Sequence, residues 1–320
     1  MTDAQASTTA APRTRIYESL TELVGGTPLL HLGRLVPGAR VLGKLESFNP
    51  SSSVKDRAAL AMVEAAEVDG RLAPGGTILE ATSGNTGIAL AWIAAARGYR
   101  AVLVMPDDSS TERRALLRGL GAELVLTPGA QGMAGANQRA GAILEATPGA
   151  FLVGQGGNDA NPRAHETTTG PEIWADTGGE VDVLVATTGT GGTISGAGRY
   201  LRSKNSDVVI VGVEPAEAPV LSGGTWQPHK IQGITGGDGV PPVTDLALID
   251  EMLTVPGDVA VATAREAMRT EGLVVGISAG AALAAARELA ARPEYSGKTI
   301  VAVLPDTGER YISTDLFDRD

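Results

Sequence analysis

Short runs rich in β-branched residues alternate with alanine-rich helical stretches along nearly the whole chain, and this alternation limits the possible folds more than any other feature. Strand-like runs occur at residues 40–45, 77–80, 100–105, 123–126, 181–186, 208–213 and 299–304, and helical spacing occurs at 54–69, 88–97, 111–120, 195–204, 259–270 and 281–291. Such alternation is typical of right-handed crossovers that build a parallel sheet with helices on both faces. A chain of 320 residues is too long for one hydrophobic core. We therefore predict an α/β fold of two three-layer α/β/α domains with mostly parallel sheets.

The turn-forming stretch at residues 158–161 is where we expect the chain to cross from one α/β unit to the other. We assign residues 16–44 together with 159–320 to a larger domain and residues 45–158 to a smaller, mobile domain. Residues 1–15 are small, polar and unpatterned, so we expect a disordered tail there. A ligand is expected at the carboxyl ends of the strands, between the two units.

Composition argues against several classes of function. The net charge of −11 disfavours nucleic acid and anionic membranes as partners, because both select basic surfaces. The absence of cysteine and the presence of three histidines leave no disulfide and little basis for a metal site. The apolar run at 88–96 is too short to span a bilayer, and residues 1–15 lack the apolar stretch of a secretory signal. We expect a cytoplasmic protein without a bound metal.

Four segments rich in glycine and hydroxyl residues stand where a strand is expected to run into a helix. They lie at residues 50–57, 82–87, 189–193 and 276–280. The first contains Lys55 at the expected start of its helix, where the positive end of the helix dipole disfavours an ammonium ion. The free amine that remains can bond covalently to a carbonyl group. A solvated lysine in a first helical turn is the plain alternative, and the other three segments argue against it.

The segment at 189–193, Gly-Thr-Gly-Gly-Thr, has the form of a phosphate-binding loop. Glycines let successive backbone N–H groups turn toward a dianion, and the threonine hydroxyls add donors. Close packing of a helix on a strand is the alternative reason for such glycines. No acidic residue follows in the pattern of a dinucleotide-binding fingerprint. A reactive amine together with a phosphate loop points to pyridoxal 5′-phosphate.

The two remaining segments suit the other ends of that cofactor and its substrate. Hydroxyls and helix N–H groups from Thr82 onward favour a carboxylate, and Asn85 can donate to a phenolate oxygen. The hydroxyl of Ser278 can hydrogen-bond a neutral pyridine nitrogen without protonating it, which restrains the reactions available. Ordinary helix capping by these hydroxyls is the alternative.

Six segments, in this order along the chain, resemble the cysteine synthase (O-acetylserine sulfhydrylase) family of fold-type II pyridoxal phosphate enzymes, which share a tryptophan synthase β-like fold. The segments are 49–57, 82–87, 189–193, 231–234, 276–280 and 304–311, and the resemblance extends from about residue 16 to residue 317. It implies that Lys55 binds the cofactor covalently, that Asn85 contacts its phenolic oxygen and that Ser278 contacts its ring nitrogen. It assigns the phosphate to Gly189, Thr190, Gly191, Gly192 and Thr193, and the substrate carboxylate to Thr82, Ser83, Thr86 and Gln155.

The resemblance implies β-replacement on O-acetyl-L-serine through an aminoacrylate intermediate, with sulfide as nucleophile and with L-cysteine and acetate as products. Lys55 would act as the general base at the α-carbon. Closure of the smaller domain around the carboxylate would exclude water. The resemblance also implies a homodimer, and it names the C-terminal peptide of serine acetyltransferase as a further partner.

Three departures from the family pattern surround the expected substrate site. Gly156 and Gly157 follow Gln155 where an aromatic residue is common, Asp159 stands where proline is usual, and the loop at 235–240 is longer and richer in glycine. Loss of an aromatic wall enlarges a pocket. This keeps open a specialised β-replacement synthase that uses another nucleophile or activated serine, as in the biosynthesis of non-proteinogenic amino acids. Neutral variation in a mobile rim is the alternative.

Two other hypotheses are disfavoured by particular residues. Cystathionine β-synthase shares the core, but the end at Asp320 leaves no room for a C-terminal regulatory domain, and residues 231–242 contain no arginine for a phosphate leaving group. A non-catalytic relative that binds a partner's peptide in the old active site would not need Lys55 and Ser278.

Overall fold

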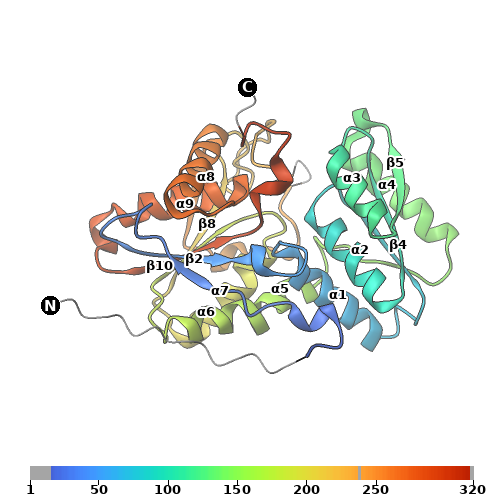
Figure 1. Ribbon diagram of the computed structural model, residues 1–320, viewed down its shortest axis with the longest axis horizontal. Coiled ribbons are helices and arrows are strands. Elements are labelled where there is room, and N and C mark those ends of the chain that lie inside the picture. The colour runs from blue at the N-terminus through green and yellow to red at the C-terminus, as the bar shows by residue number, and fades with distance from the viewer. Residues whose placement is uncertain (1–15, 237–238, 318–320) are drawn as a thin grey trace.

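The computed structural model describes residues 16–236 and 239–317. The expected tail at 1–15 and two residues of the glycine-rich loop, 237 and 238, lie outside this range. In Figure 1 the chain forms two lobes side by side, and each lobe contains its own sheet. The larger sheet has the strand order β1-β2-β10-β7-β8-β9, and the smaller has the order β5-β4-β3-β6.

The larger sheet is parallel except at one edge, where β1 pairs with β2 in the antiparallel sense. Its strands are β1 (Leu29–His31), β2 (Arg40–Leu45), β7 (Val183–Thr187), β8 (Val209–Pro215), β9 (Glu251–Val255) and β10 (Thr299–Leu304). Successive side chains of a strand alternate between faces. Val183 and Val185 therefore pack with α8 (Gly257–Glu271) and α9 (Ile277–Ala290), while Leu184 packs with α6 (Gly170–Asp176) and α7 (Gly192–Lys204).

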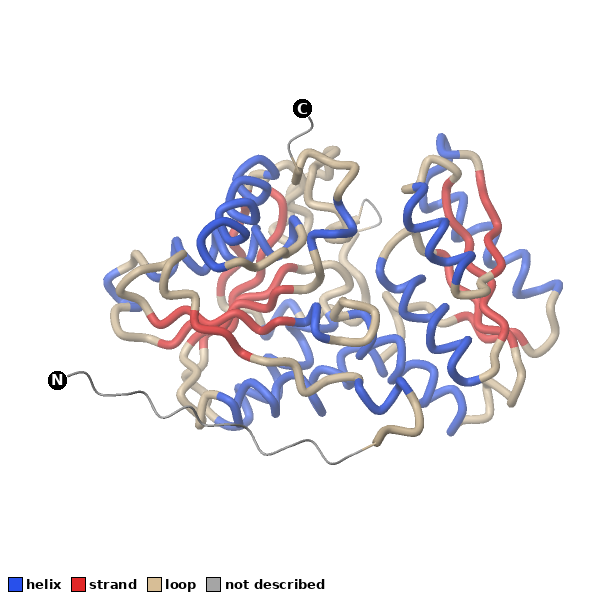
Figure 2. The backbone as a smooth tube through the Cα atoms, viewed as in Figure 1, coloured by secondary structure: helices blue, strands red, loops and turns tan. Residues whose placement is uncertain are grey.

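The smaller sheet is parallel throughout. It consists of β3 (Thr77–Ala81), β4 (Arg100–Pro106), β5 (Glu123–Thr127) and β6 (Ala150–Leu152). One face shares a core with α1 (Lys55–Val68), α2 (Asn85–Arg97) and α3 (Thr111–Gly119), and α4 (Gly132–Ala146) covers the other. Figure 2 shows helices on both sides of the strands in each lobe. The predicted fold class is confirmed.

The chain crosses from the smaller to the larger sheet through an unbroken helical segment. It runs from α5 (Ala160–Ala164) through η4 (His165–Thr169), a π-helical turn, into α6. Single π-turns within helices occur often at functional sites. The 3-10 helices are η1 (Leu20–Leu23), η2 (Glu46–Phe48), η3 (Gly129–Gln131), η5 (Leu246–Leu248), η6 (Pro293–Tyr295) and η7 (Gly308–Tyr311).

Three helices begin three or four residues earlier than their apolar spacing predicts, which corrects the sequence analysis. The helix predicted from 88 begins at Asn85, that predicted from 195 begins at Gly192, and that predicted from 281 begins at Ile277. The glycine and hydroxyl residues of each first turn carry no apolar repeat, so periodicity cannot detect them. Within the described part of the chain, no helix combines the length and the apolar character needed to cross a bilayer.

Candidate active site

Each of the four motif segments leads into a helix, at α1, α2, α7 and α9. The N-caps of α2, α7 and α9 are Gly84, Gly191 and Gly276, and none of these helices has a side-chain cap. Capping by Thr82, Ser83 or Ser278, the alternative raised by the sequence, is therefore wrong. Uncapped first turns keep backbone N–H groups available for an anionic ligand.

Lys55 differs from the other lysines of this chain. Lys44 pairs with Glu172 and Asp176, Lys204 lies over the Tyr200 ring, Lys230 pairs with Asp258 and Asp315, and Lys298 pairs with Asp182. Among the described residues, no hydrogen bond or ion pair engages the Nζ of Lys55, the first residue of α1. Burial lowers its pKa, and the negative charge of Asp306 acts against this shift. Burial, rather than the helix dipole, is therefore the main cause that favours the free amine form of Lys55.

Buried ion pairs fix the start of α1. Arg57, two residues after Lys55, is only 2% exposed. Its Nε donates to Glu46 Oε2 at 2.7 Å, and its Nη1 donates to Glu172 Oε1 at 2.7 Å. Glu46 comes from η2 and Glu172 from α6, so the pair with Glu172 connects the start of α1 to the unit at 159–320.

The loop Gly189–Thr193, called the phosphate loop from here on, has no room for side chains at its glycines. A Cβ atom at Gly191 would lie 2.3 Å from Thr244 Oγ1, and one at Gly192 would lie 2.1 Å from Asn161 Oδ1. Gly191 also has a φ of +77°, which favours glycine. Asn161 Nδ2 donates to Thr190 Oγ1 at 2.9 Å. The sequence analysis missed Asn161 and Thr244 as supports of this loop.

His165, at the π-turn, is a further support that the sequence did not reveal. Its Nε2 lies 3.3 Å from Thr193 Oγ1, and its Nδ1 lies 2.9 Å from Thr169 Oγ1. Burial, aided by the positive charges of Arg57 and Lys55, lowers the pKa of His165 to about 3. The imidazole is therefore neutral at physiological pH, and its Nε2 can hydrogen-bond the Thr193 hydroxyl.

The loop Thr82–Thr86, called the hydroxyl loop from here on, follows β3 and is more open. The Thr86 hydroxyl donates to Gln155 Oε1 at 2.7 Å, and Thr82 Oγ1 accepts from the N–H of Gly84 at 3.3 Å. A Cβ at Gly84 would meet nothing within 4 Å. Thr82, Ser83, Thr86 and Gln155 thus lie together as expected, at the first turn of α2.

Glu80, near the end of β3, supports the Gln155 side of this loop. Its carboxylate accepts the N–H groups of Gly154 at 2.8 Å and of Gln155 at 3.3 Å. Burial raises the pKa of Glu80 to about 7, and these two N–H groups oppose the shift. In addition, Asn161 Nδ2 donates to the Gln155 carbonyl at 2.9 Å, which connects the hydroxyl loop to the phosphate loop.

Asp306, after β10, joins the remaining motif residues. Its Oδ2 accepts from Asn85 Nδ2 at 2.6 Å and from the Tyr311 hydroxyl at 2.7 Å. A Cβ at Gly276 would lie 2.0 Å from Asp306 Oδ1, so glycine is needed where α9 begins. Ser278, the second residue of α9, is 4% exposed. The structure therefore brings Lys55, Asn85 and the Gly276–Ser278 turn to one place.

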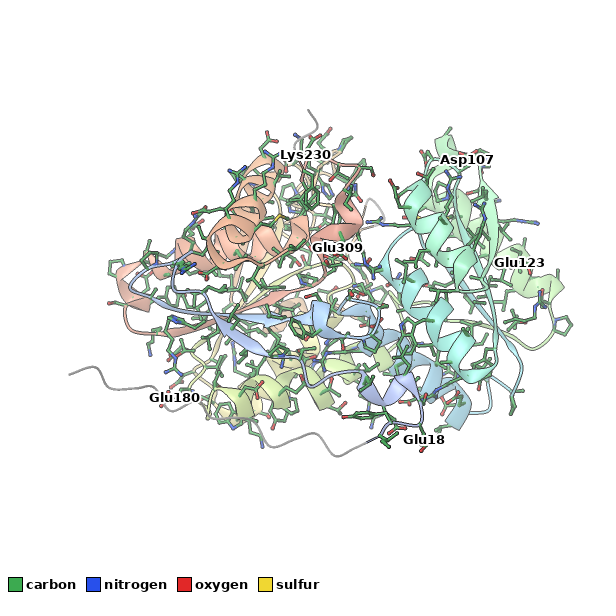
Figure 3. All side chains as sticks on the ribbon, viewed as in Figure 1. Glu18, Asp107, Glu123, Glu180, Lys230 and Glu309 are labelled. Carbon is green, nitrogen blue, oxygen red and sulfur yellow. The ribbon has the colours of Figure 1, made fainter. Side chains whose placement is uncertain are left out.

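Two arginines not identified from the sequence lie at this place. Arg310 Nη1 donates to Asn85 Oδ1 at 2.9 Å, and Arg310 also donates to the Ser51 carbonyl. Arg113, from α3, donates to the Ser83 carbonyl at 3.3 Å and lies 5.6 Å from the centre of the Tyr311 ring. Glu309, the neighbour of Arg310, lies on the side of the larger lobe that is turned toward the smaller lobe (Figure 3).

One departure from the family pattern, Gly156, lies at an open backbone position. A Cβ at Gly156 would come no closer than 3.9 Å to Pro241, so a larger residue would fit there. The Gly156 carbonyl accepts the N–H of Val243 at 3.3 Å. Residues 156 and 241–243 therefore form one rim beside Gln155.

The donor set fits pyridoxal 5′-phosphate. The phosphate loop offers uncapped N–H groups in a cradle that Cβ atoms would fill, and Lys55 offers an unpaired amine. Asn85 and Ser278 supply neutral polar groups at the starts of α2 and α9. The described residues contain no group of three or more His, Asp or Glu side chains that could hold a metal ion.

Comparison with known proteins identifies the family. The sequence profile described as "Pyridoxal-phosphate dependent enzyme" matches residues 20–306. This chain belongs to that family. It is 49% identical to cysteine synthase A of Escherichia coli K12 over 312 residues, covering 95% of this chain and 96% of that protein. It is also 49% identical to cysteine synthase of Haemophilus influenzae over 311 residues, covering 95% and 98%.

Solved structures agree with this placement. The crystal structure of cysteine synthase from Entamoeba histolytica superposes with a TM-score of 0.93 at 43% identity, covering 97% of this chain and 94% of that one. An O-ureido-L-serine synthase superposes with a TM-score of 0.92 at 46% identity, covering 95% and 96%. The resemblance to cysteine synthases is confirmed, and the protein is a pyridoxal phosphate-dependent enzyme of fold type II that acts on small molecules.

Proposed function

We propose that this enzyme is an O-acetylserine sulfhydrylase, which replaces the acetate of O-acetyl-L-serine with sulfide to give L-cysteine. The observation that carries the proposal is the unpaired, half-buried amine of Lys55 among three uncapped helix starts. The 49% identity to cysteine synthase A over 312 residues supports the choice of reaction. When bound, pyridoxal phosphate supplies an electron sink that makes the α-proton of an amino acid acidic.

Lys55 has two tasks in this proposal. Its Nζ holds the cofactor covalently between turnovers, and after release it takes the α-proton of the substrate as general base. Both tasks need an unprotonated amine, and burial favours that form. Asn85 is assigned to the cofactor's phenolic oxygen and Ser278 to its ring nitrogen. A serine there leaves the ring nitrogen neutral, which limits the reactions open to the cofactor.

The two loops divide the anionic groups between them. We assign the cofactor's phosphate to the five residues of the phosphate loop, because glycine N–H groups and the Thr190 and Thr193 hydroxyls can donate to a dianion. We assign the substrate carboxylate to Thr82, Ser83, Thr86 and Gln155, at the first turn of α2. Each ligand is bound where a helix dipole favours negative charge.

The domain boundaries remain part of the proposal. We assign residues 45–158 to a mobile unit that closes over the substrate, and residues 16–44 with 159–320 to the unit that holds the phosphate. Closure would exclude water from the reacting β-carbon. Substrate-dependent protection of the Gln155 loop from hydrogen exchange would test this closure.

Assembly and location are proposed from the family resemblance. We propose a homodimer, tested by light scattering of the purified enzyme. We propose that the C-terminal peptide of serine acetyltransferase binds the hydroxyl loop through its terminal carboxylate, tested by competition with O-acetylserine. We also propose a cytoplasmic location, tested by cell fractionation.

The test of the reaction is spectroscopic and chemical. A yellow enzyme whose visible band changes with O-acetylserine and recovers with sulfide, while cysteine appears, supports the proposal. A band that changes with O-acetylserine but recovers only slowly with sulfide would indicate that the enzyme uses a nucleophile other than sulfide. A purified protein that stays colourless after addition of pyridoxal phosphate would contradict catalysis altogether.

A further inference from the structure

Asp306 touches every segment of the site that bears on the cofactor ring, yet neither the motifs nor the proposed function gives it a task. Its side chain is 1% exposed. Its backbone carbonyl accepts the N–H of Gly276 at 3.1 Å, directly before α9. A β-bridge joins Asp306 to Ser53, and Val54 N donates to the Pro305 carbonyl at 2.8 Å. The strand segment around Asp306 therefore fixes the backbone that leads into Lys55.

The side chain of Asp306 controls the amide of Asn85. An arginine can only donate hydrogen bonds, so the contact with Arg310 Nη1 identifies the Asn85 oxygen as the atom facing it. The amide nitrogen then faces Asp306 Oδ2 at 2.6 Å. An amide nitrogen carries two N–H bonds, and this contact uses one of them. Arg310 and Asp306 together leave Asn85 in a single orientation with one N–H still to donate.

The carboxylate is itself held in place. The Tyr311 hydroxyl donates to the same Oδ2 at 2.7 Å, and Tyr311 is 2% exposed. Oδ1 is buried without a hydrogen-bond partner among the described residues, and it occupies the space that a Cβ of Gly276 would need. A buried carboxylate oxygen without a donor is costly. Such a group persists where its charge or its geometry serves a site.

The charge of Asp306 also reaches Lys55. Burial raises the pKa of Asp306, but hydrogen bonds from Tyr311 and Asn85 and the charges of Arg310 and Arg113 oppose this shift. In its carboxylate form, Asp306 favours the ammonium form of Lys55. Asp306 therefore limits how far burial can drive the lysine toward the free amine.

We propose that Asp306 is a positioning residue for the phenolic end of the cofactor: with Arg310 it orients Asn85 so that one amide N–H is directed to the phenolic oxygen. This inference rests on the proposed cofactor contact of Asn85. It assigns a role to the Leu304–Tyr311 segment that the reaction scheme leaves without one. Asp306 acts through Asn85 and touches no reacting atom.

The test is a double-mutant cycle on the full-length holoenzyme, read from the absorption bands of the bound cofactor rather than from activity. A hydrogen bond to the phenolic oxygen shifts the balance between the protonation forms of the cofactor. Loss of one such bond, at about 1 kcal/mol, changes their ratio about fivefold. Asn85→Ala and Asp306→Asn are each expected to change the ratio by about this factor. In the Asn85→Ala background, Asp306→Asn should change it clearly less than in the parent enzyme, because only the direct effect of its charge near Lys55 remains.

The outcomes distinguish a failure of the role of Asp306 from a failure of the proposed contact between Asn85 and the cofactor. Additive effects of the two substitutions, or a band unchanged by Asp306→Asn but changed by Asn85→Ala, would overturn the role of Asp306. A band unchanged by Asn85→Ala would remove the proposed contact of Asn85 first, and the inference with it. Neither result bears on whether sulfide is the nucleophile, which is measured by cysteine formation.

Two further variants keep the test decisive if Asp306→Asn does not fold. Arg310→Met removes the donor that fixes the Asn85 oxygen, and it should change the band ratio in the same direction as Asn85→Ala. An unchanged ratio in that variant would overturn the inference. Asp258→Asn is the matched control, because the side chain of Asp258 is 82% exposed and pairs with a surface lysine. It should leave the bands as in the parent enzyme.

Discussion

The phosphate loop and the hydroxyl loop both begin a helix without a side-chain cap, but they are built differently. In the phosphate loop, Cβ atoms at Gly191 and Gly192 would overlap Thr244 and Asn161. In the hydroxyl loop, a Cβ at Gly84 would meet nothing. The first loop is shaped by packed neighbours, and the second is shaped by the hydrogen bonds that Thr86 donates to Gln155 and Gly84 donates to Thr82. The difference is the one expected between a ligand that stays and a ligand that exchanges at every turnover.

The groups behind the two loops also ionise in opposite ways. His165, behind the phosphate loop, is buried and has a pKa of about 3. Glu80, behind the Gln155 end of the hydroxyl loop, is buried and has a pKa raised to about 7. Both groups therefore favour their neutral forms near neutral pH, as burial demands. Their effects on stability must then change with pH in opposite directions.

The largest expected effect comes from Lys55, which lies outside both loops and is proposed to act on both the cofactor and the substrate. Lys55→Ala should lower the turnover rate by a factor of about 10³ or more, because it removes the general base. The loops are untouched, so the variant should still fold and bind pyridoxal phosphate without a covalent bond. Steady-state rates and the cofactor content after desalting measure the two effects. Substantial activity in this variant would contradict the assignment.

Glycine substitutions test the contrast in packing directly. Gly192→Ala should weaken cofactor binding about 100-fold, since overpacking costs about 1–3 kcal/mol. Gly84→Ala should leave cofactor affinity unchanged and alter only the KM for O-acetylserine. Fluorescence titration of apoenzyme with pyridoxal phosphate gives the first quantity. Equal losses of cofactor affinity in both variants would remove the distinction between the loops.

His165 should make the enzyme sensitive to acid. Below about pH 6.5 the unfolded chain protonates this histidine, while the folded protein does so only near its pKa of about 3. Stability should therefore fall as the pH drops, by on the order of 2 kcal/mol between pH 6.5 and about 5. His165→Gln should flatten this part of the urea-unfolding profile. An unchanged slope would mean that His165 is charged in the folded state.

Glu80 should produce the opposite slope. Its folded-state pKa of about 7 lies above its usual value, so the folded protein keeps this proton to higher pH than the unfolded chain. The resulting stability is complete below about pH 4.5 and is lost as the pH rises through 7, by on the order of 2 kcal/mol. Glu80→Gln should remove that decline in the unfolding free energy. If the unfolding free energy still declines in Glu80→Gln, another ionisable group causes the decline.

Matched threonine substitutions should give the smallest effects, and they distinguish most sharply between cofactor binding by one loop and substrate binding by the other. Thr193→Val should weaken cofactor binding, and Thr86→Val should raise the KM for O-acetylserine. Each removes one hydroxyl of similar size, worth about 1 kcal/mol or about fivefold. Each variant serves as the control for the other. Weaker cofactor binding in Thr86→Val, together with a raised KM in Thr193→Val, would show that the phosphate and the carboxylate are assigned to the wrong loops.

The sequence predicted the elements of the fold well because most of them carry apolar periodicity. The strand predicted at 299–304 matches β10, and the helix predicted at 54–69 is close to α1. The first turns of α2, α7 and α9 were missed because glycine and hydroxyl residues give no such pattern. The helix α4 and the strands β1, β6 and β9 were missed as well, and so was the crossing helix. Its π-turn contains consecutive threonines and is followed by Gly170 and Pro171, residues that usually mark a break.

The site was predictable only where residues that are close in space are also close in sequence. Each loop is a contiguous segment, so its residues could be named. Its supports come from elsewhere: Asn161 and His165 from the crossing helix, Glu80 from β3 and Asp306 from the end of β10. Asp306 lies within the segment 304–311, which resembles the cysteine synthase family, but its contact with Asn85 spans 221 positions of sequence. Contacts of that range follow from the fold, which no local pattern encodes.

The central claim is that Lys55 is the amine that holds the cofactor between the two loops. Borohydride reduction of the holoenzyme, followed by peptide mapping with mass spectrometry, tests it directly because reduction makes a lysine–cofactor bond permanent. The chain offers four other lysines, Lys44, Lys204, Lys230 and Lys298, as internal controls. We predict the cofactor mass on the peptide that contains Lys55 and on none of the others. Attachment to another lysine, or no attachment to a yellow enzyme, would contradict the account.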